Sequence, residues 1–324
     1  MATKEKSDPS SETRAHKAKE ISVSIIGAGR VGTALGIGLR KAGYPIDLIV
    51  AKRQSSAKHS AHLIGKPVVA LSAARFRQLD KTAFPGSPLI IIATPDDILE
   101  SIANKLAAMS RAGASNSNRA KKRVVLHTSG AFPADALRPL RDQGFAVGSL
   151  HPLISISDSE TGAERLSDSF FSLEGDAAAV RRGRRIVRDL GSESFTISSD
   201  VKPLYHAAAL MASPNLTALF DIAIEMLARC GLSRTRARKI LLPLVKSTLD
   251  NLRSQDPTRA LTGTFKRGDI ATVRRHIAAI ESQELRDALE AYVVLGRRSL
   301  ALSGSVPNEK EIQRLLTRAS ANED

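Results

Sequence analysis

Short apolar runs alternate with longer amphipathic stretches from residue 21 to about residue 198. The short runs are rich in Val, Ile and Leu, as in buried strands, whereas the longer stretches repeat their apolar positions at helical spacing. Strands are predicted at 21–26, 44–50, 66–71, 87–94, 122–128 and 145–150, with helices at 31–43 and 96–109. Because such an order folds through right-handed crossovers, it predicts an α/β fold with a mainly parallel, doubly wound sheet.

The pattern changes after residue 151. One more strand–helix–strand unit is predicted at 170–175, 177–191 and 194–198, and beyond residue 200 the apolar positions follow helical spacing only. We therefore predict an α/β domain at 20–199 and an all-α domain at 200–324. Residues 1–19 are rich in Ser, Lys and Glu without periodicity, which predicts a disordered tail, and segment 111–122 is predicted to be a surface loop.

Composition excludes several classes of protein. Hydrophobic residues make up 42% of the chain and charged residues 25%, which is ordinary globular usage and excludes wholesale disorder. No apolar run approaches the ~18 residues of a membrane span, and the first 20 residues do not resemble a secretory signal. The single cysteine, Cys230, suits a reducing compartment. We predict a cytoplasmic protein without a membrane segment.

The net charge of +15 raises the question of a nucleic-acid partner. The cations are scattered along the chain, and neither aromatic platforms nor a zinc-finger spacing accompanies them. We interpret them as a basic surface, and we predict no nucleic-acid partner and no metal site. A basic protein still favours an anionic ligand.

A glycine-rich turn follows the first predicted strand and precedes the first predicted helix. Its residues are Gly27, Gly29, Arg30, Val31 and Gly32, in the spacing GxGxxG. In a dinucleotide-binding Rossmann domain the first glycine allows the tight turn, the second lets the backbone approach a pyrophosphate, and the third permits close helix packing. The turn therefore predicts a dinucleotide site. The alternative is a glycine turn that binds nothing.

The end of the second predicted strand indicates which dinucleotide is preferred. An acidic residue there would bind the ribose hydroxyls of NAD, but Asp47 lies inside the strand, and Lys52, Arg53 and Ser55 follow its end. Cations and a hydroxyl at this position favour the 2′-phosphate of NADP. The alternative is a basic surface turn. The nicotinamide ribose is predicted to lie against the small residues that end the next strand but one, which are Ala93, Thr94 and Pro95.

Candidate catalytic residues lie near later strand ends and on the first helix of the second domain. Ser129 and His151 follow the strands predicted at 122–128 and 145–150, on the edge where ligands of open α/β sheets bind. Lys202 and His206 share one helix face, which suits a proton donor with a charge partner. Arg267 belongs to a polar loop over 260–269. The alternatives are structural histidines, a lysine extended over apolar neighbours, and an Arg–Asp pair that caps the following helix.

Several segments together resemble a known family. They are GAGRVGTALG, HTSG, GSLHPL, KPLYHAAALMAS, ALTG with RGD, and TVRRHI. They are similar to bacterial Rossmann-like proteins with a DUF2520 C-terminal domain, over residues 20 to about 300. The resemblance implies a Rossmann domain joined to a helical domain like that of 6-phosphogluconate dehydrogenases, a plan shared with pyrroline-5-carboxylate and ketopantoate reductases. It implies an architecture and no defined substrate.

The resulting hypothesis is an NADP-dependent oxidoreductase for a small, polar, anionic carbonyl or imine compound, bound between the two domains. His206 is the expected proton donor and Lys202 its charge partner, while His151 and Ser129 line the site. Arg267 is expected to bind the anionic group of the substrate. The alternative is a dinucleotide-binding sensor without catalysis, because the Lys-x-x-Asn pair of related hydroxyacid dehydrogenases is missing.

The sequence also predicts a homodimer formed through the helical half. Helices at 207–229 and 285–302 carry more apolar surface than a domain of this size hides alone. The resembled dehydrogenases dimerise through the same domain, which implies the same arrangement.

Overall fold

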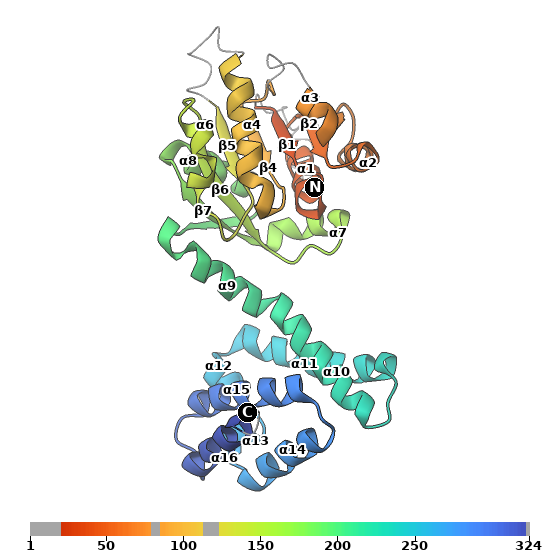
Figure 1. Ribbon diagram of the computed structural model, residues 1–324, viewed down its shortest axis with the longest axis vertical. Helices are drawn as coiled ribbons and strands as arrows, with labels where there is room; N and C mark the ends of the chain where they lie inside the picture. Colours follow the sequence, from red (N-terminus) through yellow and green to blue (C-terminus); the bar gives the residue numbers. More distant parts are fainter. Residues whose placement is uncertain (1–20, 79–84, 113–122, 322–324) are drawn as a thin grey trace, which may run out of the picture. The chain divides into compact units, whose positions relative to one another are not determined.

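The computed structural model describes residues 21–78, 85–112 and 123–321 (Figure 1). The predicted tail at 1–19 and almost all of the predicted loop at 111–122 lie outside these residues. The chain divides into two compact units, Met1–Ala209 and Leu210–Asp324. The predicted domain boundary was 199/200, so Lys202 and His206 lie in the same unit as the sheet.

The first unit contains one sheet of eight strands among the described residues. Its order is β3-β2-β1-β4-β5-β6-β7-β8. The strands are β1 (Val23–Ile26), β2 (Ile46–Ala51), β3 (Val69–Ser72), β4 (Leu89–Ile92), β5 (Val124–His127), β6 (Ala146–Leu153), β7 (Phe170–Gly175) and β8 (Glu193–Thr196). β1 to β6 pair in parallel, β7 pairs with β6 in the antiparallel direction, and β8 is parallel to β7. The predicted α/β fold with a mainly parallel sheet is confirmed.

Helices cover both faces of this sheet, which explains why the central strands are mostly apolar and why their polar residues Ser24 and His127 are buried as well. All residues of β1, β4 and β5 are buried. One apolar cluster joins alternate strand residues to α1 (Arg30–Lys41), α7 (Ser159–Glu164) and α8 (Ala177–Asp189). A second cluster joins the opposite face to α3 (Ala73–Gln78), α4 (Leu99–Ala112) and α6 (Arg138–Arg141). α2 (Gln54–Ile64) contributes Ile64 to the first cluster.

The sixth strand is longer than the apolar run predicts. β7 pairs with it from Gly148 opposite Gly175 to Leu153 opposite Phe170, so the strand continues past residue 150. His151 therefore lies within the strand, opposite Ser172, and not in a loop after its end. The prediction was wrong at this point because Pro152, which cannot donate a ladder hydrogen bond, is typical of a strand end.

The second unit is helical throughout its described residues, as predicted. α9 (Lys202–Ala212) leads out of the sheet unit, and the helices that follow are α10 (Pro214–Arg229), α11 (Arg234–Ser254), α12 (Pro257–Ala260), α13 (Thr264–Arg267), α14 (Ile270–Ser282), α15 (Arg286–Ser303) and α16 (Glu309–Ala321). The core of the unit joins apolar residues of α14, α15 and α16. Pro214 occupies the first turn of α10, where its missing N–H costs nothing.

One helical stretch of the described residues, Ser199–Arg229, is long and apolar enough to cross a membrane by length and composition. On its own this is weak evidence. Only 6% of the most apolar 18-residue segment of this stretch is buried within the chain. The predicted absence of a membrane segment therefore stays a prediction.

Candidate functional site

The backbone packing of the turn requires glycine at its first and third glycine positions. Gly27 has φ +117°, and a Cβ there would overlap the carbonyl group of Ala93. A Cβ on Gly32 would overlap the carbonyl oxygen of Gly27. Both close approaches pack the turn against β4 and α1, so these two positions are explained without any ligand.

Gly29 has a different environment. Its φ is −81°, which any residue can adopt, and a Cβ there would meet no atom within 4 Å. Gly29 is the N-cap of α1 and, as a glycine, has no side chain that could cap the first N–H groups of the helix. Such a helix N-terminus favours a phosphate group. The open space before Gly29 therefore fits a pyrophosphate.

The pocket in front of Gly29 has a volume of about 610 Å³. It lies between the start of α1, α2 and the start of α7. Its polar lining includes Arg30, Thr33, Ser55, Ser56, His59 and Ser159, together with the carboxylates of Asp158 and Glu160 at its α7 side. Its size is within the ~300–1,000 Å³ of small-molecule sites. Guanidinium, imidazole and hydroxyl groups of this kind suit a phosphorylated ligand.

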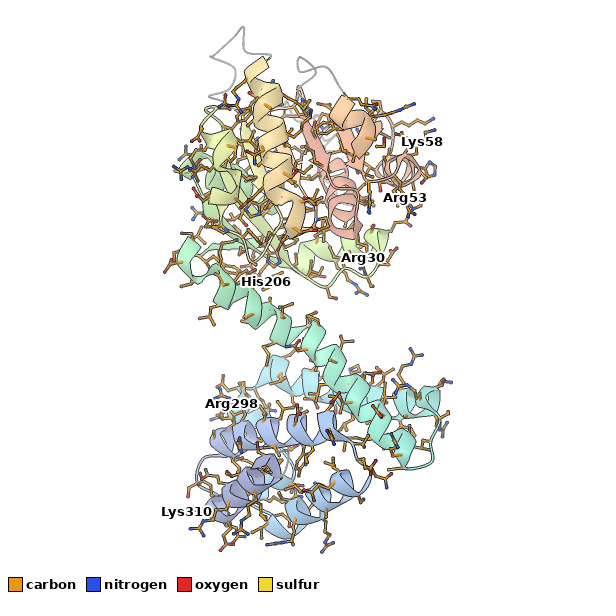
Figure 2. The ribbon with its side chains drawn as sticks, in the orientation of Figure 1. Arg30, Arg53, Lys58, His206, Arg298 and Lys310 are labelled. Atoms are coloured by element: carbon orange, nitrogen blue, oxygen red, sulfur yellow. The ribbon has the colours of Figure 1, made fainter. Side chains whose placement is uncertain are left out.

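The structure brings some of the predicted cofactor residues into this pocket and leaves others outside it. Gly29, Arg30 and Ser55 line it. Lys52 and Arg53 are exposed residues at the start of α2 that do not line it, and Figure 2 shows Arg30, Arg53 and Lys58 on the same side of the sheet unit. The role predicted for Lys52 and Arg53 stays a prediction.

The remaining predicted cofactor residues lie around the turn. Val31 is half-buried in the first turn of α1. The backbone of Ala93, just after β4, packs against Gly27, and Pro95 follows one residue beyond Thr94. The Oγ1 atom of Thr94 is buried and has no hydrogen-bond partner among the described residues. A buried hydroxyl without a partner costs free energy, which makes Thr94 a fitting place for a ligand group.

Sequence reasoning missed Ser56 and His59, which also line the pocket. A signal for His59 was present, because residues four apart share a helix face and Ser55 was already a candidate. No such pattern in the sequence indicated that Ser159 lines the pocket. α7 packs against α1 from about 130 residues further along the chain, and Ser159 donates a hydrogen bond to the carbonyl of Arg30 at 3.3 Å.

A second group of polar residues gathers around Gly130, near the carboxyl ends of β5 and β6. A Cβ on Gly130 would overlap Nδ1 of His206 and lie 2.8 Å from Nε2 of His151. The two imidazole rings stand edge to face with their centroids 5.6 Å apart. Nδ1 of His206 is buried and has no hydrogen-bond partner among the described residues. The two predicted histidines are therefore brought together, and both direct a ring nitrogen towards the Gly130 backbone.

Tyr205 completes this group, although sequence reasoning did not select it. Its hydroxyl lies 2.7 Å from Nδ1 of His151. Burial raises the pKa of the Tyr205 phenol, so it stays protonated at neutral pH. Burial, with smaller contributions from His206 and Lys202, lowers the pKa of His151 to about 4. At neutral pH His151 is therefore an uncharged imidazole.

Lys202 is buried beneath the same site, with no exposed surface. Its ammonium donates to Oγ of Ser149 at 2.8 Å and lies 3.5 Å from the carbonyl oxygen of Ser129. Burial lowers the pKa of Lys202, against the opposing charges of Glu174 and Asp96. The alternative of a lysine extended over an apolar surface is wrong. Because the ammonium is inaccessible, we assign it to holding the Ser129 backbone in place.

The loop that carries Ser129 and Gly130 is held from several sides. Oγ of Ser129 accepts hydrogen bonds from the N–H groups of Ala131 and Phe132 at 3.2 and 3.0 Å. Nδ1 of His127 accepts the N–H of Ser129 at 3.2 Å, and Nε2 of the same ring lies 3.2 Å from the carbonyl oxygen of Pro133. His127 is 0% exposed, and burial lowers its pKa to about 3. Its role is structural.

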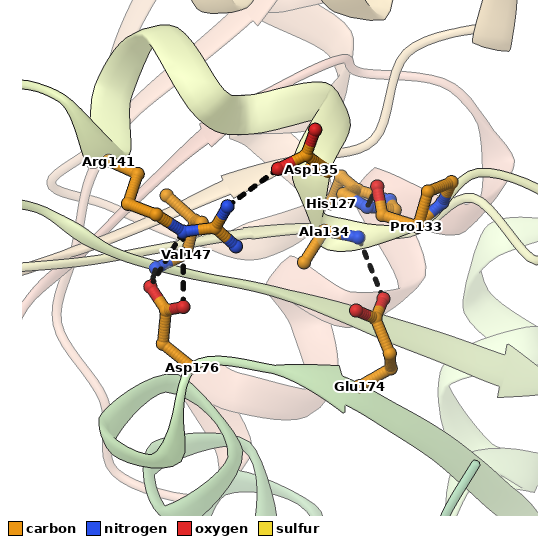
Figure 3. A network of polar contacts seen from close by, with 8 residues as sticks. All are labelled: His127, Pro133, Ala134, Asp135, Arg141, Val147, Glu174 and Asp176. Atoms are coloured by element: carbon orange, nitrogen blue, oxygen red, sulfur yellow. Dashed lines mark hydrogen bonds and ion pairs between the residues drawn. The ribbon is translucent and has the colours of Figure 1, made fainter. Parts of the chain in front are cut away.

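Carboxylates from β7 and the turn after it tie the continuation of this loop to the sheet (Figure 3). Glu174 accepts the N–H of Ala134 at 2.7 Å. Asp176 accepts the N–H of Val147 at 2.9 Å and Nε of Arg141 at 3.1 Å. These bonds fix the backbone from which Ser129 and Gly130 project.

Arg267 lies in the second unit, at the end of α13. The next two residues have structural roles. Gly268 has φ +63°, and a Cβ there would overlap the carbonyl of Pro307. Asp269 caps α14 by accepting the N–H of Thr272 at 3.0 Å, which confirms the capping alternative for the aspartate. A role for Arg267 in substrate binding stays a prediction.

Two sequence families match the chain. Residues 5–152 match a Rossmann-like domain, and residues 169–299 match a domain of unknown function, DUF2520. The domain pair predicted from the motifs is confirmed. No curated protein sequence matches the chain.

Solved structures resemble the chain over most of its length. A proposed NADP oxidoreductase from Bacteroides fragilis is 18% identical, with a TM-score of 0.66 over 87% of this chain and 98% of that one. An imine reductase from Myxococcus stipitatus in complex with NADP+ is 15% identical, with a TM-score of 0.56 over 92% and 99%. The NADP-bound pyrroline carboxylate reductase of Plasmodium falciparum is 12% identical, with a TM-score of 0.52 over 89% and 100%. At these identities the likeness shows the fold.

Proposed function

We propose that this chain is an oxidoreductase that uses a nicotinamide dinucleotide. The observation that carries the proposal is the contrast within the glycine turn, where Gly27 and Gly32 are needed for packing and Gly29 faces an open pocket. The unpartnered hydroxyl of Thr94 beside the turn supports it. Solved oxidoreductases of the same fold bind NADP or NAD, which also supports it.

The residues that would hold the dinucleotide are those of the pocket. The N–H groups of α1 and the side chains of Arg30, Ser55 and His59 suit its phosphates, and Thr94 suits the nicotinamide end. When bound, a reduced nicotinamide supplies a hydride.

The group around Gly130 would supply the proton. We propose that the Tyr205 hydroxyl donates to Nδ1 of the neutral His151, which leaves its Nε2–H free to donate to the oxygen or nitrogen of a carbonyl or imine. His206 then gives a proton to that atom as carbon accepts the hydride, which balances the reduction. Lys202 and His127 keep the Ser129–Gly130 backbone in place beneath the reacting group.

We further propose that the substrate is a small, polar, anionic carbonyl or imine compound and that NADPH is preferred over NADH. The net charge of +15 favours an anionic substrate. The cations of the pocket and of the start of α2, Arg30 and Arg53, favour the additional phosphate of NADP.

The first test is a fluorescence titration of the protein with NADPH and NADH. We expect NADPH to bind at least ~10-fold more tightly, which is ~1.4 kcal/mol and typical of one charge-assisted contact. Arg53→Glu should weaken NADPH selectively. Lys58→Glu, an exposed position of the same helix more than one turn away from the N-cap Arg53 and the end of β2, is the matched control and should leave the ratio unchanged. Equal affinities for both dinucleotides would contradict the preference.

The second test separates an enzyme from a sensor. The protein loaded with NADPH is assayed at 340 nm against a panel of small keto acids and cyclic imines. Turnover of any member supports the enzyme. Tight binding of NADPH without turnover of any member would support the alternative of a dinucleotide-binding sensor.

A further inference from the structure

A second pocket lies at the opposite edge of the sheet from the glycine turn. Its volume is about 420 Å³, and it is formed where β5 and β6 begin and α8 passes over them. Its lining includes Arg123, Ala146, Ala178, Arg181, Arg182 and Arg185. The two alanines have small side chains, and four arginines line the hollow, of which Arg181 and Arg185 are exposed and Arg123 and Arg182 half-buried.

Three of these arginines come from α8, and Arg185 lies four residues after Arg181 and three after Arg182, so it neighbours both on the helix surface. Like charges at this spacing destabilise a helix. Arg185 has a distant partner, since its Nε lies 4.0 Å from a carboxylate oxygen of Asp189 that already accepts the hydroxyl of Tyr44. Within the described part of the chain, no carboxylate forms an ion pair with Arg181 or Arg182.

Arg141 differs from these arginines, because two carboxylates lie near enough to form ion pairs with it. Arg141 binds Asp135 at 2.7 Å and Asp176 at 3.1 Å (Figure 3). Arg181 and Arg182 have no such carboxylate partners among the described residues. They are adjacent in the sequence, so their two positive charges lie close together. An anion from solution would remove their repulsion and accept forked hydrogen bonds.

We propose that this pocket binds a small polyphosphate-type anion, with Arg181, Arg182 and Arg185 as its principal ligands. The pocket is at the small end of the range for ligand sites, which fits a compact anion. Arg181, Arg182 and Arg185 line the hollow, whereas Arg184 and Arg188 of the same helix lie outside it. The site lies at the amino ends of the strands and does not depend on the proposed function.

The test is calorimetric titration of the full chain with inorganic tripolyphosphate in moderate chloride. The double variant Arg181→Ala/Arg182→Ala should weaken binding at least ~10-fold, since each lost charge-assisted hydrogen bond contributes about 1.5–3 kcal/mol. The matched control is Arg184→Ala/Arg188→Ala, which removes the same charge from exposed positions of the same helix outside the pocket. The control should stay within ~2-fold of the parent, because screened surface charges contribute little.

Three results would overturn the proposal. Equal weakening in both double variants would show a response to net charge alone. Unchanged binding in Arg181→Ala/Arg182→Ala would place the anion elsewhere. Loss of binding in Gly29→Val would place it at the glycine turn. Arg181→Lys/Arg182→Lys guards against an effect on folding, since it keeps the charge without the fork and should bind between the parent and the alanine variant.

Discussion

Gly29 differs from the other glycines of its turn because a side chain there would contact nothing in the protein. A valine at this position should leave the fold intact and fill the space in front of the α1 N-terminus. We therefore expect Gly29→Val to weaken NADPH binding at least ~100-fold, because the N–H groups of the turn can no longer reach the pyrophosphate.

Gly86→Val is the matched control for this variant. A Cβ on Gly86 would also meet no atom within 4 Å, its φ is not positive, and it precedes β4 at the amino edge of the sheet. Both variants should keep the thermal midpoint of the parent, measured by circular dichroism. Unchanged NADPH affinity in Gly29→Val would mean that the turn has only a structural role.

His206 is the residue on which the proposed proton transfer depends. Its unpartnered Nδ1 faces the Gly130 backbone beside the neutral His151. We expect His206→Ala to lower kcat by ~10²-fold or more, as is typical for loss of a general acid, with NADPH affinity within ~2-fold of the parent. His62→Ala, an exposed histidine of α2 outside the pocket, should change neither quantity. A full kcat in His206→Ala would assign the proton to another group.

The loop of the candidate site is held by hydrogen bonds of His127, and the contribution of this residue to the stability of the fold depends on pH. His127 has a pKa of about 3 in the folded chain and an ordinary value of about 6.5 when unfolded. The unfolded chain therefore takes up this proton first as the pH falls. The stability associated with the neutral His127 is fully present above pH 6.5 and is lost between pH 6.5 and about 3, with a slope of at most ~1.4 kcal/mol per pH unit.

This prediction is checked by urea unfolding, followed by circular dichroism, at a series of pH values. His127→Gln keeps a donor for the Pro133 carbonyl and removes the titrating group, so the fall in stability below pH 6.5 should be shallower than in the parent. His62→Ala should reproduce the parent slope, because His62 is exposed. His151, whose pKa falls to about 4, acts in the same direction and remains in every variant. Identical slopes in parent and His127→Gln would contradict the assignment.

The elements were predictable where local pattern and burial agree. Continuous apolar runs identified β1, β4 and β5, because a parallel sheet buries both faces. The partner of β6 could not be read from its own residues, so the strand was predicted two or three residues too short. Tyr205 was missed for a similar reason. It is adjacent to His206 and off its helix face, and only the packing of α9 on β6 brings it to His151.

At the scale of the whole molecule, the second unit presents many large apolar side chains to solvent. On α10, α11 and α15 they are Leu216, Leu219, Ile240, Leu242, Leu244, Leu249, Leu252, Val294 and Leu295. Leu244 is 63% exposed and Val294 is 61% exposed. Monomers rarely expose large apolar patches, and two of these side chains, Leu216 and Leu219, belong to the stretch Ser199–Arg229, which is long and apolar enough to cross a membrane.

We expect a second copy of the chain to cover this surface, which is the homodimer predicted from the sequence. Burying side chains of this size contributes about 1.5–3 kcal/mol each, so burying several of them from each copy can offset the ~4–15 kcal/mol cost of association and give micromolar affinity. Light scattering at micromolar concentration should give twice 34.7 kDa. Leu244→Glu/Val294→Glu should shift the mass to that of one chain. Val69→Glu, at a 58% exposed apolar residue of the sheet unit, is the matched control and should stay dimeric. A parent mass of one chain would contradict the dimer, and binding of the parent to lipid vesicles would favour a membrane as the covering surface instead.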